Sequence, residues 1–132
     1  MTCVLHLAER EHWEPARSRG TYDRSTRGGS VVGTGFVHAS TSSQMSRVAD
    51  AVYADVPASS LVLLVVDEEV LAAHGVEVRW ENLDGGEELF PHLYGSLPAA
   101  AVTAELEVTL DAQGRFVLPD LRGSDVRMGP PA

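Results

Sequence analysis

LVLLVV at residues 61–66 decides the fold, because six consecutive aliphatic residues leave this segment without a polar face. A run of this length, rich in Val, predicts a strand, since helices in globular proteins are usually longer. A strand that is apolar on both faces is typically covered on both faces. We therefore expect residues 61–66 to form a central, fully buried strand.

Strands and helices are predicted on both sides of this segment, in an irregular order. Residues 2–7 predict a first strand, and residues 9–19 predict a helix that ends at Gly20, although Pro15 should shorten or bend it. Further strands are expected at residues 35–38, 76–80 and 102–110, and residues 90–95 are expected to be a strand or the exit of one. A helix is expected at residues 67–74, and a hairpin turn at residues 111–114 leading into residues 115–118. This irregular mixture favours an α+β fold over a doubly wound sheet.

Thr41 and Gln44 indicate where the helix after the strand at residues 35–38 begins. A Ser or Thr followed three residues later by Glu or Gln is a capping box, in which each side chain bonds the other residue's backbone N–H. Behind it, apolar residues recur at helical spacing and predict a core-facing stripe of Met45, Val48, Ala49, Val52 and Tyr53. Residues 21–34, rich in Gly, Ser, Thr and Arg, predict a loop long enough to act as a lid.

The composition predicts one globular domain. The chain has 132 residues, of which 44% are hydrophobic, enough for a core without disulfides or structural metals. We expect residues 1–110 to form the body, and residues 111–132 to add a hairpin strand and a disordered tail. The single cysteine, Cys3, excludes an internal disulfide and a metal site with several cysteine ligands. No segment has the roughly 20 apolar residues that cross a bilayer, and no signal-peptide pattern is present, so we expect a cytoplasmic protein without a membrane partner.

The charge is strongly acidic and unevenly distributed. The formal net charge is −9, with a net +1 over residues 1–50 and a net −10 over residues 51–132, and all ten basic residues are Arg. This acidity argues against binding to DNA or to an anionic membrane. It does not exclude RNA, and it leaves a small anionic ligand or a nucleotide near the Arg-bearing half as a candidate partner.

Three histidines form the candidate site. His6, His38 and His92 each lie at the edge of an apolar stretch, where a fold holds polar groups rigidly beside a cleft. His38 is followed by Ser40 and Thr41 at the predicted helix start, whose free N–H groups suit a phosphate or carboxylate. The alternatives are that His6 is structural and that Thr41 only caps the helix.

Other chemistries find less support in the sequence. Imidazoles from separate strands can hold zinc, but no HxH, HxxxH or HExxH spacing is present. A G-x-S-x-G elbow and a P-loop lysine are also missing. Among the carboxylates, Glu81, Glu87 and Glu88 lie close in sequence to His92 and could orient its imidazole or stabilise a cationic transition state.

Three segments of the chain carry a family resemblance. They are Val-Leu-His-Leu at residues 4–7, Gly-Phe-Val-His-Ala-Ser-Thr at residues 35–41 and Phe-Pro-His-Leu-Tyr-Gly at residues 90–95. Together they resemble the DUF952 family, small bacterial proteins of unknown function, over about residues 2–110.

That family is in turn similar to ADP-ribosyltransferase-like proteins, which implies a mixed, strongly twisted sheet with short helices and an NAD site. By position, the resemblance implies that His6 holds the NAD ribose and that His38 lies against the nicotinamide. A third residue, often Glu in that superfamily, corresponds to Glu88 or His92. The missing QxE-type motif argues against protein ADP-ribosylation, and some superfamily members instead remove a 2′-phosphate from RNA with NAD.

We therefore expect a domain that binds NAD or a related nucleotide. In this hypothesis His38, His92 and Glu88 are the catalytic residues, and the cofactor-binding residues are His6, Ser40, Thr41 and Gln44. The reaction would be displacement at the ribose carbon that bears nicotinamide, with the protein supplying position and charge. The alternatives are a non-catalytic module for a small anion or a partner, and a zinc-dependent hydrolase.

Overall fold

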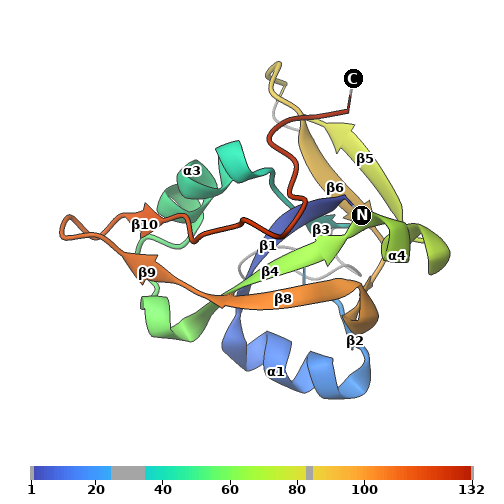
Figure 1. Cartoon of the computed structure of the whole chain (residues 1–132), viewed down its shortest axis with the longest axis horizontal. Helices are drawn as coiled ribbons and strands as arrows, with labels where there is room; N and C mark the ends of the chain where they lie inside the picture. The colour runs from blue at the N-terminus through green and yellow to red at the C-terminus, as the bar shows by residue number, and fades with distance from the viewer. Residues whose placement is uncertain (1, 25–34, 83–84, 132) are drawn as a thin grey trace.

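The computed structural model describes residues 2–24, 35–82 and 85–131, and it has the predicted α+β architecture (Figure 1). Every pairing between its named strands is antiparallel. None of its described helices is long and apolar enough to span a bilayer. The expected loop at residues 21–34 falls largely outside the described residues, apart from a two-residue strand at its start.

The central sheet contains β1 (Cys3–Glu9), β4 (Leu61–Asp67) and β8 (Val102–Glu107), with β4 in the middle. All seven residues of β4 are buried, which confirms the prediction for this segment. Alternate β4 side chains enter two separate core clusters, one containing Leu64 and the other Leu63. The strand is apolar on both faces because each face covers a different core.

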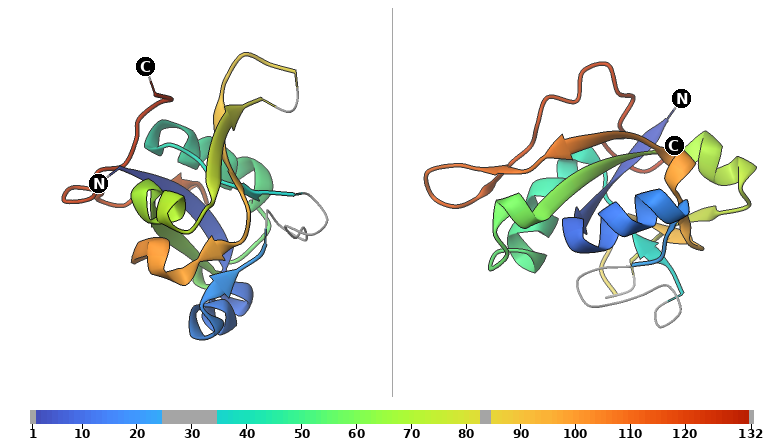
Figure 2. Two further views of the ribbon diagram at one scale, coloured as in Figure 1. Left: turned by 90° about the vertical axis from the view of Figure 1, so that its right-hand side faces the viewer. Right: turned by 90° about the horizontal axis from the view of Figure 1, so that it is seen from below.

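A second sheet carries the candidate site. It has the order β3–β6–β5, formed by β3 (Val37–His38), β6 (Phe90–Tyr94) and β5 (Glu77–Glu81). Two further pairs of short strands each form a separate two-stranded sheet among the described residues. They are β2 (Thr21–Tyr22) with β7 (Leu97–Pro98), and β9 (Thr109–Leu110) with β10 (Phe116–Val117). The β9–β10 hairpin projects from the body at the end opposite α4 (Figures 1 and 2).

Three α-helices of the described residues pack around these sheets. They are α1 (Arg10–Arg19), α3 (Ser42–Val52) and α4 (Glu68–Ala73), and two short 3-10 turns lie at η1 (Ala58–Ser60) and η2 (Ala99–Ala101). Gly20 ends α1 with φ 98°, a left-handed conformation that suits glycine. Pro15 lies inside α1 without ending it. The capping box of α3 is formed, and the Thr41 N–H donates to Gln44 Oε1 at 3.0 Å.

The chain after the hairpin returns to β1, where the sequence predicted a disordered tail. The Cys3 N–H donates to the Asp125 carbonyl at 2.7 Å, and the Arg127 N–H donates to the Cys3 carbonyl at 2.9 Å. The Arg127 carbonyl then accepts from the Ser42 N–H at 2.8 Å, and the Arg127 guanidinium bonds Glu68 at 2.6 Å. Residues 125–128 are therefore tied to β1, α3 and α4. Local composition did not reveal these contacts because all of them are with distant segments.

Candidate functional site

His38 and His92 face each other across β3 and β6. They are direct partners in the antiparallel register, and their ring centroids lie 5.1 Å apart in an edge-to-face arrangement. Residues directly opposite in neighbouring strands share one face of a sheet. The register between two strands therefore brings together two histidines that are far apart in the chain.

The same register extends the row to β5, where Arg79 is the partner of His92. The opposite side of this sheet packs into the core through Val37, Leu93, Val78 and Trp80. The side that carries the histidines is polar and aromatic. We call it the histidine face, and it comprises Phe36, His38, Phe90, His92, Tyr94, Glu77, Arg79 and Glu81.

Aromatic rings surround the two imidazoles. The Phe36 ring lies 4.7 Å from the His92 ring and 5.6 Å from the Tyr94 ring, and the Phe90 ring lies 5.5 Å from the His38 ring. His92 is buried beneath these neighbours, whereas Phe36, His38, Phe90 and Tyr94 are half-buried. The face thus presents several flat surfaces that are held by a sheet rather than by a loop.

Glu81 is the carboxylate of this site. Its Oε1 accepts a short hydrogen bond from the Tyr94 hydroxyl and lies 3.6 Å from His92 Nδ1. The hydrogen bond to Glu81 raises the pKa of Tyr94. A carboxylate beside an imidazole can orient the ring and stabilise nearby positive charge. Of the carboxylates that the sequence offered for this role, Glu81 is the one that contacts His92.

Glu88 lies elsewhere. It forms an exposed ion pair with Arg47 of α3, at 2.5 Å, and this pairing lowers the pKa of Glu88. No contact between Glu88 and His38 or His92 occurs within the described ranges of the chain. Its place in sequence next to the His92 segment was misleading, because the turn before β6 directs it toward α3.

His6 is buried beneath the site and does not open onto it. Its Nδ1 bonds the His38 carbonyl at 2.6 Å, and its Nε2 bonds the Tyr22 hydroxyl at 3.1 Å. A carbonyl can only accept, so Nδ1 carries the proton and, in the neutral ring, Nε2 accepts from Tyr22. Both ring nitrogens are therefore engaged within the protein. The role that the resemblance implied, contact with a ribose, does not fit this arrangement.

The environment keeps the His6 and His38 imidazoles uncharged near neutral pH. Burial lowers the pKa of His6 to about 4, against a smaller opposing effect of its bond to the His38 carbonyl. Burial, and then the proximity of His92 and His6, lowers the pKa of His38 to about 4. A neutral imidazole donates one hydrogen bond and accepts another, so His38 suits hydroxyl groups better than it suits phosphate.

Ser40, Thr41 and Gln44 serve the backbone around the site. Ser40 and Leu5 exchange both of their backbone hydrogen bonds, at 2.8 Å each, and so fasten the exit of β3 to β1. Gln44 accepts from the Thr41 N–H and donates to the Leu89 carbonyl at 2.7 Å, just before β6. The Ser42 N–H is bonded to the tail. The N–H groups of Thr41 and Ser42 at this helix start are therefore already bonded within the protein.

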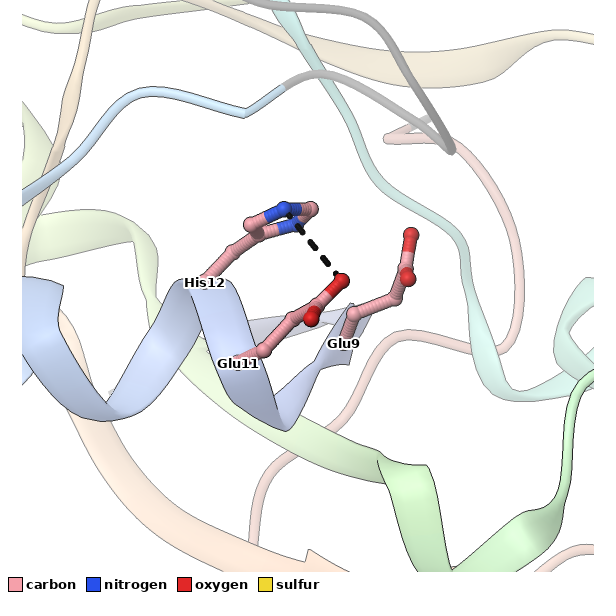
Figure 3. A group of neighbouring side chains, drawn as sticks. All are labelled: Glu9, Glu11 and His12. Atoms are coloured by element: carbon pink, nitrogen blue, oxygen red, sulfur yellow. Dashed lines mark ion pairs between the residues drawn. The ribbon is translucent and has the colours of Figure 1, made fainter.

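The metal-ligand geometry lies away from the histidine face. In the part of the chain that the structure describes, one group of His, Cys, Asp and Glu side chains has its ligand atoms within 4.8 Å of one another: Glu9, Glu11 and His12, at the junction of β1 and α1 (Figure 3). His12 forms an ion pair there with Glu11, whose side chain is 74% exposed. His6, His38 and His92 do not form such a group, so the zinc-hydrolase hypothesis finds no support at the histidine face.

Sequence reasoning missed the aromatic and tyrosine members of the site. Tyr22 bonds His6 from β2, and Phe36 lies against both His92 and Tyr94. The alternation of residues 90–94 carried a signal for Phe90, His92 and Tyr94, since alternate residues of a strand share a face. No local pattern linked them to Phe36 or Tyr22.

Comparisons with known proteins give a family and a fold but no activity. The model of the family described as "Protein of unknown function (DUF952)" matches residues 7–105. The crystal structure of protein CC0527 from Caulobacter crescentus is similar, with 31% identity, a TM-score of 0.69, and coverage of 88% of this chain and 94% of that one. Its solution NMR structure gives 32% identity, a TM-score of 0.67, and coverage of 87% and 91%. A search of curated proteins gave no match. The resemblance seen in the sequence is confirmed at the level of the family, and the chain belongs to DUF952.

Proposed function

We propose that the histidine face binds NAD or a related nucleotide. The observation that supports this most is the His38–His92 pair, set directly across two strands and bordered by half-buried aromatic rings. Aromatic side chains stack on the flat rings of nucleotides, and neutral imidazoles exchange hydrogen bonds with ribose hydroxyls. The resemblance to ADP-ribosyltransferase-like proteins points to NAD within this ligand class.

The residues of the face fit a ribose and a nicotinamide ring. His38, half-buried and uncharged, is the residue we assign to a ribose hydroxyl. Glu81, beside His92, replaces Glu88 as the carboxylate that would stabilise positive charge. NAD carries a glycosidic bond between ribose and nicotinamide, and its cleavage supplies an ADP-ribosyl group. His6 is a positioning residue in this proposal, since it holds the His38 backbone.

We expect NAD+ to raise the melting temperature of the protein saturably. A ligand at 100 times its Kd adds about 2.7 kcal/mol to the free energy of unfolding, which is several degrees in a domain of this size. His38→Ala should abolish the shift, because it removes the proposed ribose contact. The measurement is differential scanning fluorimetry with NAD+, NADH and ADP-ribose.

His74→Ala is the matched control. His74 caps the C-terminal end of α4 and is exposed, and its side chain bonds the Val70 carbonyl of its own helix, so the NAD+ shift should survive its removal. If none of the three nucleotides stabilises the native protein at millimolar concentration, the proposed function is wrong. Release of nicotinamide from NAD+ separates an enzyme from a binding module, since only an enzyme consumes the nucleotide.

Glu88→Gln provides a second check of the site. Glu88 is bound to Arg47 and the Gln44 amide rather than to the histidines, so we expect NAD+ to bind this variant with unchanged affinity. Isothermal titration of wild type and variant measures this. A loss of binding would return Glu88 to the site that the sequence predicted for it.

A further inference from the structure

All the charged side chains of the histidine face come from β5. Arg79 bonds Glu77 at 3.2 Å, and both side chains are more than half exposed. Glu81 is 28% exposed and is bonded to the Tyr94 hydroxyl beside His92. His38 is uncharged near neutral pH. The face therefore carries one more carboxylate than cation. Arg79 forms its ion pair with Glu77, and its charge also acts on Glu81, which lies beside His92 and is bonded to Tyr94.

The rings of the face add to this preference for positive charge. The faces of aromatic rings are negative, and a cation within about 6 Å of a ring centroid is attracted to them. The protein itself uses this property, because the Arg79 guanidinium lies 4.2 Å from the centroid of the Tyr94 ring. Phe36 and Phe90 provide further half-buried rings, Phe36 beside His92 and Phe90 beside His38. Partial burial strengthens such contacts, since less water competes for the charge.

We propose that the histidine face recognises a flat, positively charged heteroaromatic ring, with Phe36 and Phe90 contacting the ring and Glu81 as its counter-charge. This inference deepens the proposed function and rests on it for the nucleotide. The oxidised nicotinamide ring of NAD+ is of this class, whereas the reduced ring of NADH is uncharged. An anionic group is disfavoured next to Glu81, so the phosphates of the nucleotide extend away from β5.

Two matched ligand pairs test the role of charge. NAD+ and NADH differ in ring charge at nearly the same size, and so do 1-methylnicotinamide and nicotinamide. We expect calorimetric titration to give at least about tenfold tighter binding for the cationic member of each pair. Glu81→Gln should remove this preference while leaving NADH binding in place, because Gln still accepts from Tyr94 but carries no charge.

Two further variants separate charge from structure. Phe36→Leu keeps the bulk of the side chain but removes its ring, and it should also narrow the difference between NAD+ and NADH. Glu107→Gln changes the net charge by the same amount at an exposed position of β8 and should leave the preference unchanged. Thermal unfolding of each variant verifies that it is folded.

The outcomes distinguish the inference from the proposed function. Equal binding of NAD+ and NADH, unchanged by Glu81→Gln, overturns the inference and leaves the nucleotide site standing. Binding of 1-methylnicotinamide without binding of any nucleotide supports the inference and overturns the proposed function. If neither cation binds, the inference is overturned, and if NADH and ADP-ribose also fail to bind, the proposed function is overturned with it.

Discussion

Acidification from about pH 7 to about pH 5 should lower the free energy of unfolding by about 2 kcal/mol through His6 alone. The pKa of His6 is about 4 in the folded protein, compared with about 6.5 in an unfolded chain. Between these values the unfolded state binds more protons than the folded state. Stability is therefore complete above the unfolded pKa and is lost as the pH falls toward 4. His38 has the same direction of shift and adds to the loss.

A His6→Asn variant isolates this contribution. The Asn side chain offers an N–H to the His38 carbonyl but has no group that titrates in this range, so it keeps one bond and removes the proton uptake. We expect it to be less stable than wild type at about pH 7 and to lose about 2 kcal/mol less on acidification. Urea unfolding at the two pH values measures both effects.

Acid also weakens contacts that do not involve His6. Carboxylates such as Glu105, whose pKa is lowered by its bonds to Trp13 and Arg17, also lose stabilising contacts in acid, and they do so equally in both proteins. His74→Asn, at the exposed C-terminal cap of α4, should retain the full wild-type slope. If the slope of His6→Asn matches that of wild type, His6 is not held neutral by its burial.

The sequence predicted those parts of the fold that are determined by interactions between residues close together in the chain. The aliphatic run of β4 and the capping box of α3 each contain their whole signal within a few residues, and both are present. The α+β class followed from the irregular order of such segments. Pro15 shows the limit of local reasoning, since α1 continues through it while Trp13 and Ala16 of the same helix are buried.

The candidate site depends on how β3 and β6 are aligned, and a single sequence contains no local signal for the alignment of two distant strands. His38 and His92 meet because β3 pairs with β6 at one particular alignment, and that alignment also brings Arg79 into the row. The alternation of β1 correctly separated His6 from Leu5 and Leu7. It could not reveal that the second face also packs into a core, where Tyr22 completes the hydrogen bonding of His6. The alternation around His6 is the same whether its side chain contacts a ligand or is buried in a structural role.

Removing the chain after Ser124 should destabilise the protein by about 2–4 kcal/mol. The tail makes three backbone hydrogen bonds to Cys3 and Ser42, each of which contributes about 0.5–1.5 kcal/mol. It also provides Arg127, whose guanidinium bonds the largely buried Glu68. Val126 packs against the core cluster that contains Cys3. The change therefore removes a segment that acts as an extra edge for β1.

Labelling of Cys3 gives a local measurement of the same effect. The Cys3 thiol is fully buried, and burial raises its pKa, so it should react slowly with a disulfide reagent in the native protein. Truncation should increase the rate by about tenfold or more, because each 1.4 kcal/mol lost from local opening is a factor of ten. Arg122→Ala, which removes only an exposed pair with Asp120, should leave both the rate and the urea midpoint unchanged. If the truncated chain instead has the labelling rate and the stability of the wild-type protein, residues 125–128 contribute nothing to β1. The disordered tail predicted from their composition would then be the better description of these residues.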